Sequence, residues 1–371
     1  MKVFRLEKYL AQHEFTAKYL LCCSDAESFS MSEILGMANE EERDLWDGLR
    51  LSYTEVPGLP ALRARVAESM YNGLGPENIF MFAGAGEGIF CALKQLAGPM
   101  EHIIVITPCY QSLLEVPQST GAEITEVELR PENEWRIDLN QIEAAIRPNT
   151  KCIVVNFPHN PTGQIIEEEE LKALIALCEP RGIWLFSDEV YRMLGDRSMT
   201  SPVANLYSRG LSLGVMSKSF GLAGLRVGWV ASQDREILKK MEQLKHYTSI
   251  CNSAPSEILS LIALRNKDVL LERNNSIVAD NLALLDGFFA EHSELFEWVR
   301  PRGGCVGFVK YKAGPAQAFC DYVLREKNLL LLPESVYNYH GNYFRIGFGR
   351  SNMPEALEQL RDFCAGNAGI R

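Results

Sequence analysis

The sequence predicts an α/β protein in which a large domain, with a mostly parallel sheet between helices, is joined to a smaller α/β domain. Two observations carry this prediction. Short apolar runs alternate with helical patterns through the middle of the chain, as in a parallel sheet that is covered on both faces. In addition, 371 residues are more than one ordinary hydrophobic core accommodates, which favours two domains.

The central elements follow from the same alternation. Apolar runs of strand length predict five strands, at 79–82, 102–107, 151–156, 183–187 and 211–216. Helical patterns between these runs predict three helices, at 86–97, 139–147 and 167–180. The last of these helices begins with a run of acidic residues, which the positive end of a helix dipole favours.

The C-terminal part of the chain continues with helices and a second alternation. Helical patterns are expected at 235–246 and 255–264, and a long amphipathic stretch at 269–292 connects to the second domain. Beyond it, strand-like segments (298–311, 344–348) alternate with helical ones (315–327, 354–365). We expect an N-terminal arm and part of the small domain at 1–45, the large domain at 46–275, and the C-terminal small domain at 276–371.

Composition excludes several classes of protein. Hydrophobic residues make up 47% of the chain and charged residues 23%, as in a soluble globular protein. The formal net charge of −11 argues against nucleic acid or an anionic membrane as the main partner. We expect no membrane span, no signal peptide and no metal site, because the apolar runs are too short and the histidines lack ligand spacing. The ten cysteines form no C-x-x-C pair, which favours free thiols in a reducing, cytoplasmic compartment.

Several polar residues lie where the predicted strands end, which is where parallel sheets bind ligands. Asn160 and Lys218 each follow a strand, and Asp188 ends one. A lysine in a small, glycine-rich turn can hold an aldehyde cofactor such as pyridoxal phosphate (PLP) as a Schiff base. This cofactor also needs an anion at its pyridine nitrogen, donors at its phenolic oxygen and a cation at its phosphate. Asp188, Asn160 with Tyr191, and Arg226 can supply these groups.

The order and spacing of these motifs are similar to those of a known family. The motifs are Asn160-Pro161-Thr162-Gly163, Asp188-Glu189-Val190-Tyr191, and Lys218 followed eight residues later by Arg226. They resemble the PLP-dependent aminotransferases of fold type I, class I/II (the aspartate aminotransferase superfamily), over almost the full length. The resemblance implies PLP as cofactor and a mostly parallel sheet of the seven-stranded type. It also implies a homodimer with shared active sites, and transfer of an amino group between an α-amino acid and a 2-oxo acid.

The resemblance assigns roles to individual residues. Lys218, Asp188 and Tyr191 are expected to be catalytic, with Lys218 as the Schiff-base lysine and Asp188 opposite the pyridine nitrogen. Asn160 and Tyr191 are expected to contact the phenolic oxygen. Arg345, in Tyr343-Phe344-Arg345-Ile346-Gly347, is expected to hold the substrate carboxylate near Asn160, with Arg350 as a rival.

Further cofactor contacts are implied around the phosphate and the ring. Tyr110, in the turn Pro108-Cys109-Tyr110, is expected to stack on the pyridine. The groups expected at the phosphate are Gly84, Ala85 and Gly86 at a helix N-terminus, Ser217, Arg226, and Tyr53 of the neighbouring subunit.

Two departures from the family pattern leave questions open. Val215 stands three residues before the lysine, where the family has Ser or Thr, so Ser217 and the turn at Gly84 would bind more of the phosphate. The loop 22–28 does not match the family's substrate loop, so the amino donor and acceptor stay open.

Three alternative functions compete with amino transfer. A PLP-dependent lyase, decarboxylase or cyclising enzyme would use the same residues. A PLP-sensing regulator is less favoured, because the segment before about residue 50 is too short and too acidic for a DNA-binding module. An oxidoreductase of the dinucleotide-binding type is disfavoured, because no G-x-G-x-x-G follows the first strand.

Overall fold

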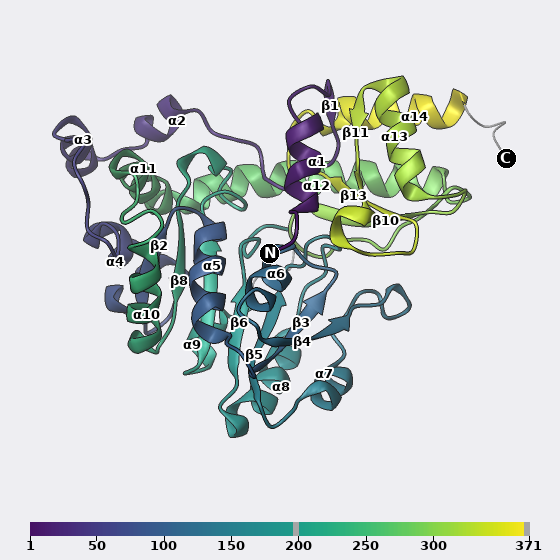
Figure 1. Ribbon diagram of the computed structural model, residues 1–371. Coiled ribbons are helices and arrows are strands. Elements are labelled where there is room, and N and C mark those ends of the chain that lie inside the picture. The colour runs from purple at the N-terminus through teal and green to yellow at the C-terminus, as the bar shows by residue number, and fades with distance from the viewer. Residues whose placement is uncertain (196–199, 367–371) are drawn as a thin grey trace.

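A computed structural model describes residues 1–195 and 200–366 of the protein (Figure 1). Its centre is a seven-stranded sheet with the order β2-β8-β7-β6-β5-β3-β4. The strands are β2 (Ile79–Phe82), β3 (His102–Thr107), β4 (Glu123–Glu128), β5 (Thr150–Asn156), β6 (Trp184–Asp188), β7 (Gly210–Val215) and β8 (Gly228–Ala231). Strand β8 runs antiparallel to the other six strands of this sheet, which share one direction. The predicted fold class, a mostly parallel sheet between helices, is confirmed.

Helices cover both faces of the large sheet (Figure 1). Successive side chains of a strand point to opposite faces, so each strand contributes to the packing on both sides. Val154 of β5 packs in one hydrophobic cluster, and Ile153 and Val155 in another. Among the helices that contribute to the first cluster are α5 (Ala85–Leu96), α6 (Ser112–Gln118) and α10 (Arg235–Lys245). Helices α7 (Leu139–Ala145) and α8 (Glu168–Cys178) contribute to the second, and α4 (Pro60–Met70) and α11 (Ala254–Arg265) contribute to a third, around β2 and β8.

A second α/β layer joins the two ends of the chain. Its four-stranded sheet has the order β12-β13-β10-β9, from β9 (Phe296–Glu297), β10 (Val306–Tyr311), β12 (Leu332–Pro333) and β13 (Tyr343–Gly347). Its other elements are α1 (Arg5–His13), β1 (Tyr19–Leu20), β11 (Leu329–Leu330), α12 (Lys267–Glu291), α13 (Ala316–Lys327) and α14 (Met353–Gly366). β1 pairs in parallel with β11, so the N-terminal arm lies among the C-terminal elements (Figure 1). The domain limits stay a prediction, and α12 is continuous across the limit expected at 275–276.

Short elements complete the described part of the chain. They are α2 (Met31–Gly36), α3 (Glu40–Asp47), α9 (Val203–Leu206) and the 3-10 turns η1 (Pro76–Asn78), η2 (Pro131–Asn133), η3 (Glu179–Arg181), η4 (Ala223–Leu225) and η5 (Glu334–Tyr337).

The structure contains further elements that the sequence prediction did not include, and three of the differences concern strands of the two larger sheets. Strand β4 was not expected, because it lies at the sheet edge and its acidic side chains break the apolar pattern. Strand β8 was not expected either, because it has only four residues. The strand expected at 298–311 is shortened to β10, because the preceding loop is held elsewhere. There Arg302 N and Gly303 N donate to Gly163 O over 2.8 and 3.0 Å.

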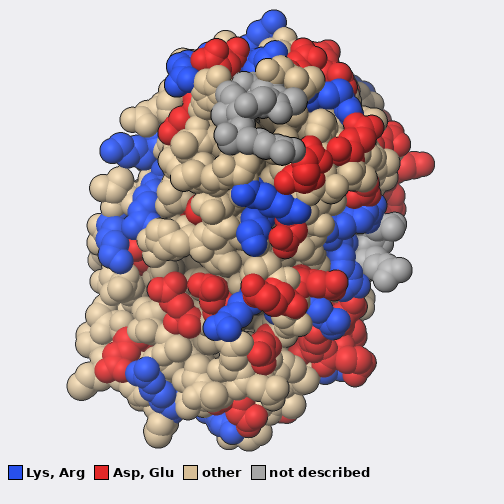
Figure 2. Space-filling model, turned by 90° about the vertical axis from the view of Figure 1, so that its right-hand side faces the viewer, with Lys and Arg blue, Asp and Glu red and all other residues tan. Residues whose placement is uncertain are grey.

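Neither the distribution of surface charge nor the cysteines indicate a particular class of binding partner. On the described part of the face in Figure 2, Lys and Arg side chains are interspersed with Asp and Glu, and no continuous basic area is seen. Within residues 1–195 and 200–366, no helix combines the length and apolar content that crossing a bilayer requires. All ten cysteines are free thiols, and Cys251 alone among them is not buried.

Candidate active site

The carboxyl ends of β5, β6 and β7 form one wall of a cavity of about 450 Å³. Asn156 and Asp188 end neighbouring strands and are register partners, and Lys218 follows β7 by three residues. Ten of the residues predicted for the site line this cavity: Ala85, Gly86, Tyr110, Asn160, Asp188, Tyr191, Ser217, Lys218, Arg226 and Arg345. Sequence-distant motifs therefore meet at one place.

The two other predicted residues lie outside this lining. Gly84 is the N-cap of α5, directly before the residues that line the cavity. Tyr53 does not reach the cavity of its own chain, and 84% of it is exposed. Its predicted role belongs to the cavity of a second subunit, so this placement leaves that role open.

The N-terminus of α5 and Arg226 form a site for an anion. Gly84 has φ of 86°, and a Cβ there would lie 2.7 Å from Arg226 Nη2, so the close approach of the guanidinium requires glycine. Ser217 and Val215 also line the cavity, and of these two only Ser217 has a side-chain hydroxyl that can donate. Free N–H groups at a helix N-terminus, a hydroxyl and an arginine are the donors that a phosphate needs. The residues present therefore fit the phosphate of PLP.

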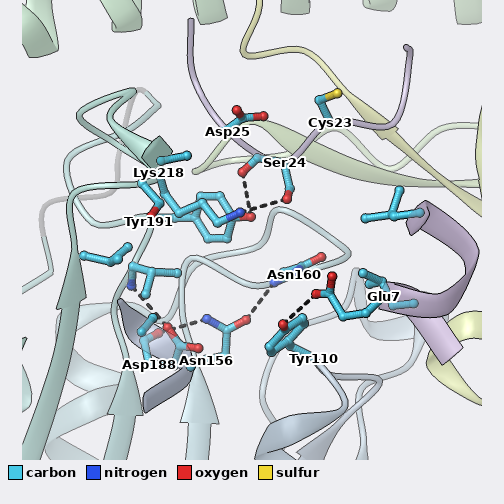
Figure 3. A pocket seen from close by; sticks show the side chains of 18 of the residues that line it. Glu7, Cys23, Ser24, Asp25, Tyr110, Asn156, Asn160, Asp188, Tyr191 and Lys218 are labelled. Atoms are coloured by element: carbon cyan, nitrogen blue, oxygen red, sulfur yellow. Dashed lines mark hydrogen bonds between the residues drawn. The ribbon is translucent and has the colours of Figure 1, made fainter. Parts of the chain in front are cut away.

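Asp188 lies in a setting that suits a cation. Its side chain is 4% exposed, and its Oδ1 accepts a hydrogen bond from Val190 N at 3.2 Å. Its backbone oxygen accepts from Asn156 Nδ2 at 2.9 Å (Figure 3). Burial raises the pKa of the Asp188 carboxyl to about 7. A cation placed against it would restore the ionised form, which is what a protonated pyridine nitrogen requires.

Lys218 points into the cavity, with its Nζ directed toward Ser24 (Figure 3). Its Nζ donates to Ser24 Oγ at 2.9 Å and lies 5.8 Å from the centre of the Tyr191 ring. Tyr191 Oη donates to Ser24 O at 2.9 Å. Burial lowers the pKa of Lys218, because the charged ammonium is desolvated. A neutral amine in this place can attack a carbonyl carbon.

Arg345 is a buried cation with capacity for an anion. It is 2% exposed, and its Nη1 donates to Asn160 Oδ1 at 3.1 Å and to Tyr337 Oη at 2.6 Å. Its Nη2 donates to Cys22 O at 2.7 Å, whereas its buried Nε has no hydrogen-bond partner among the described residues. In the described chain no carboxylate forms an ion pair with it. Such a guanidinium suits a bidentate contact with a ligand carboxylate.

The rival arginine is already neutralised. Arg350 Nη2 lies 3.0 and 2.9 Å from the two carboxylate oxygens of Asp25, so this pair has no net charge. Both residues line the cavity. This geometry favours Arg345 over Arg350 as the carboxylate-binding residue.

Several cavity residues were missed by the sequence prediction. Asn156 ends β5, and its Oδ1 accepts a hydrogen bond from Asn160 N at 2.9 Å. The search for polar residues at the carboxyl ends of predicted strands, which located Asp188, would also have found Asn156. Ser24 had no local signal, because it contacts Lys218 only after distant segments pack together. The same holds for Tyr337, which lies outside the cavity lining and donates to Asn160 Oδ1. The unmatched loop proves to border the cavity with Cys22, Cys23, Ser24 and Asp25.

Comparison with known proteins agrees with this geometry. Residues 22–360 match the family model described as aminotransferase class I and II. The arginine–pyruvate transaminase AruH of Pseudomonas aeruginosa is 34% identical over 330 residues, covering 84% of this chain and 80% of that protein. A PLP-dependent aminotransferase structure from Streptococcus suis has a TM-score of 0.92 at 31% identity, over 98% of both chains. The PLP-dependent cyclase OrfR has a TM-score of 0.91 at 26% identity, over 99% of this chain and 98% of its own.

The motifs, the seven-stranded sheet and these matches agree, and together they confirm the predicted family, fold and cofactor. This chain belongs to the class I and II aminotransferase family, whose members depend on pyridoxal phosphate.

Proposed function

We propose that the protein transfers an amino group between an α-amino acid and a 2-oxo acid. The observation that carries this proposal is the arrangement of three groups in one cavity: the amine of Lys218, whose pKa is lowered by burial, the buried carboxyl of Asp188, and the guanidinium of Arg345, which has no carboxylate partner among the described residues. These are the groups that must act on the Cα–H bond, the cofactor ring and the substrate carboxylate. We place the protein in the cytoplasm on its composition.

Each residue then has a physical task. When bound, PLP supplies a carbonyl that takes up the substrate amine and a ring that accepts the electrons of the broken Cα bond. Lys218 Nζ accepts the proton from Cα and returns it at the cofactor carbon. Asp188 holds the proton on the ring nitrogen, because a buried carboxylate stabilises a neighbouring cation. Arg345 fixes the carboxylate, so that the Cα–H bond faces the lysine.

A second candidate is a PLP-dependent lyase, decarboxylase or cyclising enzyme. It is favoured by the likeness of nearly the whole chain to the cyclase OrfR. The same lysine, carboxyl and arginine would serve, and contacts to the substrate side chain would decide which bond at Cα breaks. A regulator that only senses PLP is less favoured, because it would have no need for a lysine of lowered pKa beside an arginine that has no carboxylate partner among the described residues.

A single-turnover experiment separates these functions. Purified holoenzyme is mixed with each amino acid in turn, without a 2-oxo acid, while the cofactor spectrum is followed and the product is identified by mass. An aminotransferase converts the cofactor to its amino form and releases the 2-oxo acid. A lyase or cyclising enzyme releases a different product and returns the cofactor to its starting form.

Arg345→Ala is expected to lower kcat/KM for α-amino acids about thirty- to a thousandfold, because a desolvated bidentate contact contributes about 2–4 kcal/mol. Arg345→Lys should lose much of the same activity, since an ammonium lacks the planar fork. Steady-state kinetics measure both effects, and the cofactor spectrum should not change. Arg350→Lys is the matched control, because Arg350 is already paired with Asp25. A larger loss at Arg350 than at Arg345 would reverse the assignment.

We also propose a homodimer in which Tyr53 completes the phosphate site of the partner. In support, the side chain of Tyr53 is 84% exposed, and two other large side chains, Leu51 and Tyr247, are 88% and 90% exposed. Tyr53→Phe should weaken PLP binding about tenfold, because a hydrogen bond to a charged phosphate is lost. Mixing Tyr53→Phe subunits with Lys218→Ala subunits tests the shared site. At limiting PLP the hybrid should regain activity, because its intact lysine faces an intact tyrosine from the other chain; no recovery would place Tyr53 in its own subunit's site or in none.

A further inference from the structure

The cavity has a second side that the proposed function does not use. In Figure 3, Cys23, Ser24 and Asp25 border the cavity opposite Asp188, and Glu7 of α1 lies at its edge. This side is where the side chain of a substrate would lie, because Arg345 and Lys218 are assigned to the groups attached to Cα. Its chemistry therefore bears on which amino acids can bind.

Helix α1 turns one face toward the cavity. Glu7, Leu10 and Glu14 all line it, and their spacing of three and four residues places them on one helical face. Glu14 is half-buried, and within the described chain its carboxylate has neither a hydrogen-bond partner nor an ion pair. Glu7 accepts one hydrogen bond, from Tyr110 Oη at 2.7 Å. Neither carboxylate forms an ion pair among the described residues, although the charge of Glu14 is one of those that raise the pKa of Arg350.

The positive groups of the cavity are all committed elsewhere. Arg226 lies at the phosphate site, and Lys218 is needed at the reacting carbon. Arg345 is reserved for the carboxylate, and its buried Nε without a partner points to a ligand at that place. The remaining cation, Arg350, is neutralised by Asp25, whose two oxygens lie 3.0 and 2.9 Å from its Nη2.

We propose that the cavity selects an α-amino acid with a cationic side chain, a guanidinium or an ammonium, and that Glu14, assisted by Glu7, binds this cation. This inference rests on the proposed function and adds the substrate class to it. An uncharged or acidic side chain would leave two carboxylates uncompensated beside it. A cation satisfies them, and Leu10 between them offers apolar contact to the methylene stem.

The test compares a cationic amino acid with its uncharged isostere. Arginine and citrulline have almost the same shape, but only arginine carries a charge. For wild-type holoenzyme, kcat/KM for arginine is expected to exceed that for citrulline by about ten- to a hundredfold, because a hydrogen bond to a charged group is at stake. Glu14→Gln should reduce this ratio toward one, and Glu14→Asp should keep part of it. Lysine as a further substrate distinguishes a guanidinium site from one for any cation.

A binding measurement separates recognition from turnover. Guanidinovalerate has the carboxylate and the guanidinium of arginine but lacks the α-amino group, so it cannot react. Its affinity for the wild-type holoenzyme, measured by titration calorimetry, should exceed that of the uncharged ureidovalerate by a similar factor, and Glu14→Gln should remove the difference. Glu132→Gln is the matched control, because it removes an exposed carboxylate that does not line the cavity.

The outcomes keep the two proposals apart. If no amino acid of any charge converts the cofactor to its amino form, amino transfer fails, but calorimetry still decides the cation site. If citrulline or glutamate reacts as well as arginine, or if Glu14→Gln keeps the wild-type ratio, the cation site is overturned and amino transfer stands. A preference for glutamate would show that Arg350 leaves Asp25 to bind an acidic side chain.

Discussion

Lys218→Ala is expected to abolish turnover, with a loss of at least about a hundred- to ten-thousandfold from proton transfer alone. The variant removes the only lysine among the described residues that line the cavity, and with it the amine of lowered pKa. PLP should still bind weakly, because the helix N-terminus and Arg226 are unchanged. Borohydride treatment followed by peptide mapping should fix the cofactor to Lys218 in the wild type and to no lysine in the variant.

Chemical rescue provides the control for this variant. A small amine added in solution can replace the lost proton carrier, so it should restore part of the turnover of Lys218→Ala without changing the wild type. Labelling of another lysine in the wild type, or normal turnover of the variant, would show that the Schiff base forms elsewhere.

Asp188→Asn is expected to fold but to lose activity by about a hundred- to several thousandfold. Removing one partner of a buried ion pair costs about 3–5 kcal/mol, and the amide cannot hold the proton on the ring nitrogen. The cofactor spectrum and kcat measure the effect. Glu189→Gln is a matched control, because this neighbouring carboxyl is also buried but bonds to Val203 N and Ser212 Oγ instead of lining the cavity. Near-normal turnover of Asp188→Asn would show that Asp188 has only a structural role in the turn after β6.

The same substitution should change how the stability of the apoprotein depends on pH. The pKa of Asp188 is raised from 3.8 to about 7, so the folded state binds the proton more tightly than the unfolded state. The stability that this carboxyl contributes is therefore fully present below about pH 4 and is lost as the pH rises through about 7. Urea denaturation of the apoprotein at several pH values should show this decline, and Asp188→Asn should lack it. An unchanged pH profile would contradict the raised pKa.

The cofactor half of the site was accessible from the sequence. Asn160, Asp188 and Lys218 each stand at or just beyond the carboxyl end of an apolar strand, and parallel strands bring these ends to one edge. Strand identity is a local property of five or six apolar residues, so periodicity located β3, β5, β6 and β7 to within two residues. Residue type and spacing then indicated the chemistry, because few sites need a lysine, a carboxyl and an arginine in this order.

The substrate half was decided by the tertiary structure. Glu7, Glu14 and Ser24 reach the cavity because β1 pairs with β11, across some 310 residues of chain. No local pattern encodes a two-residue strand pair of that separation. The neutralisation of Arg350 by Asp25 likewise exists only once these segments pack together. Motif and periodicity determined the family and its cofactor. Which charged groups of the cavity face the substrate side chain without a partner depends on long-range packing, which local sequence does not specify.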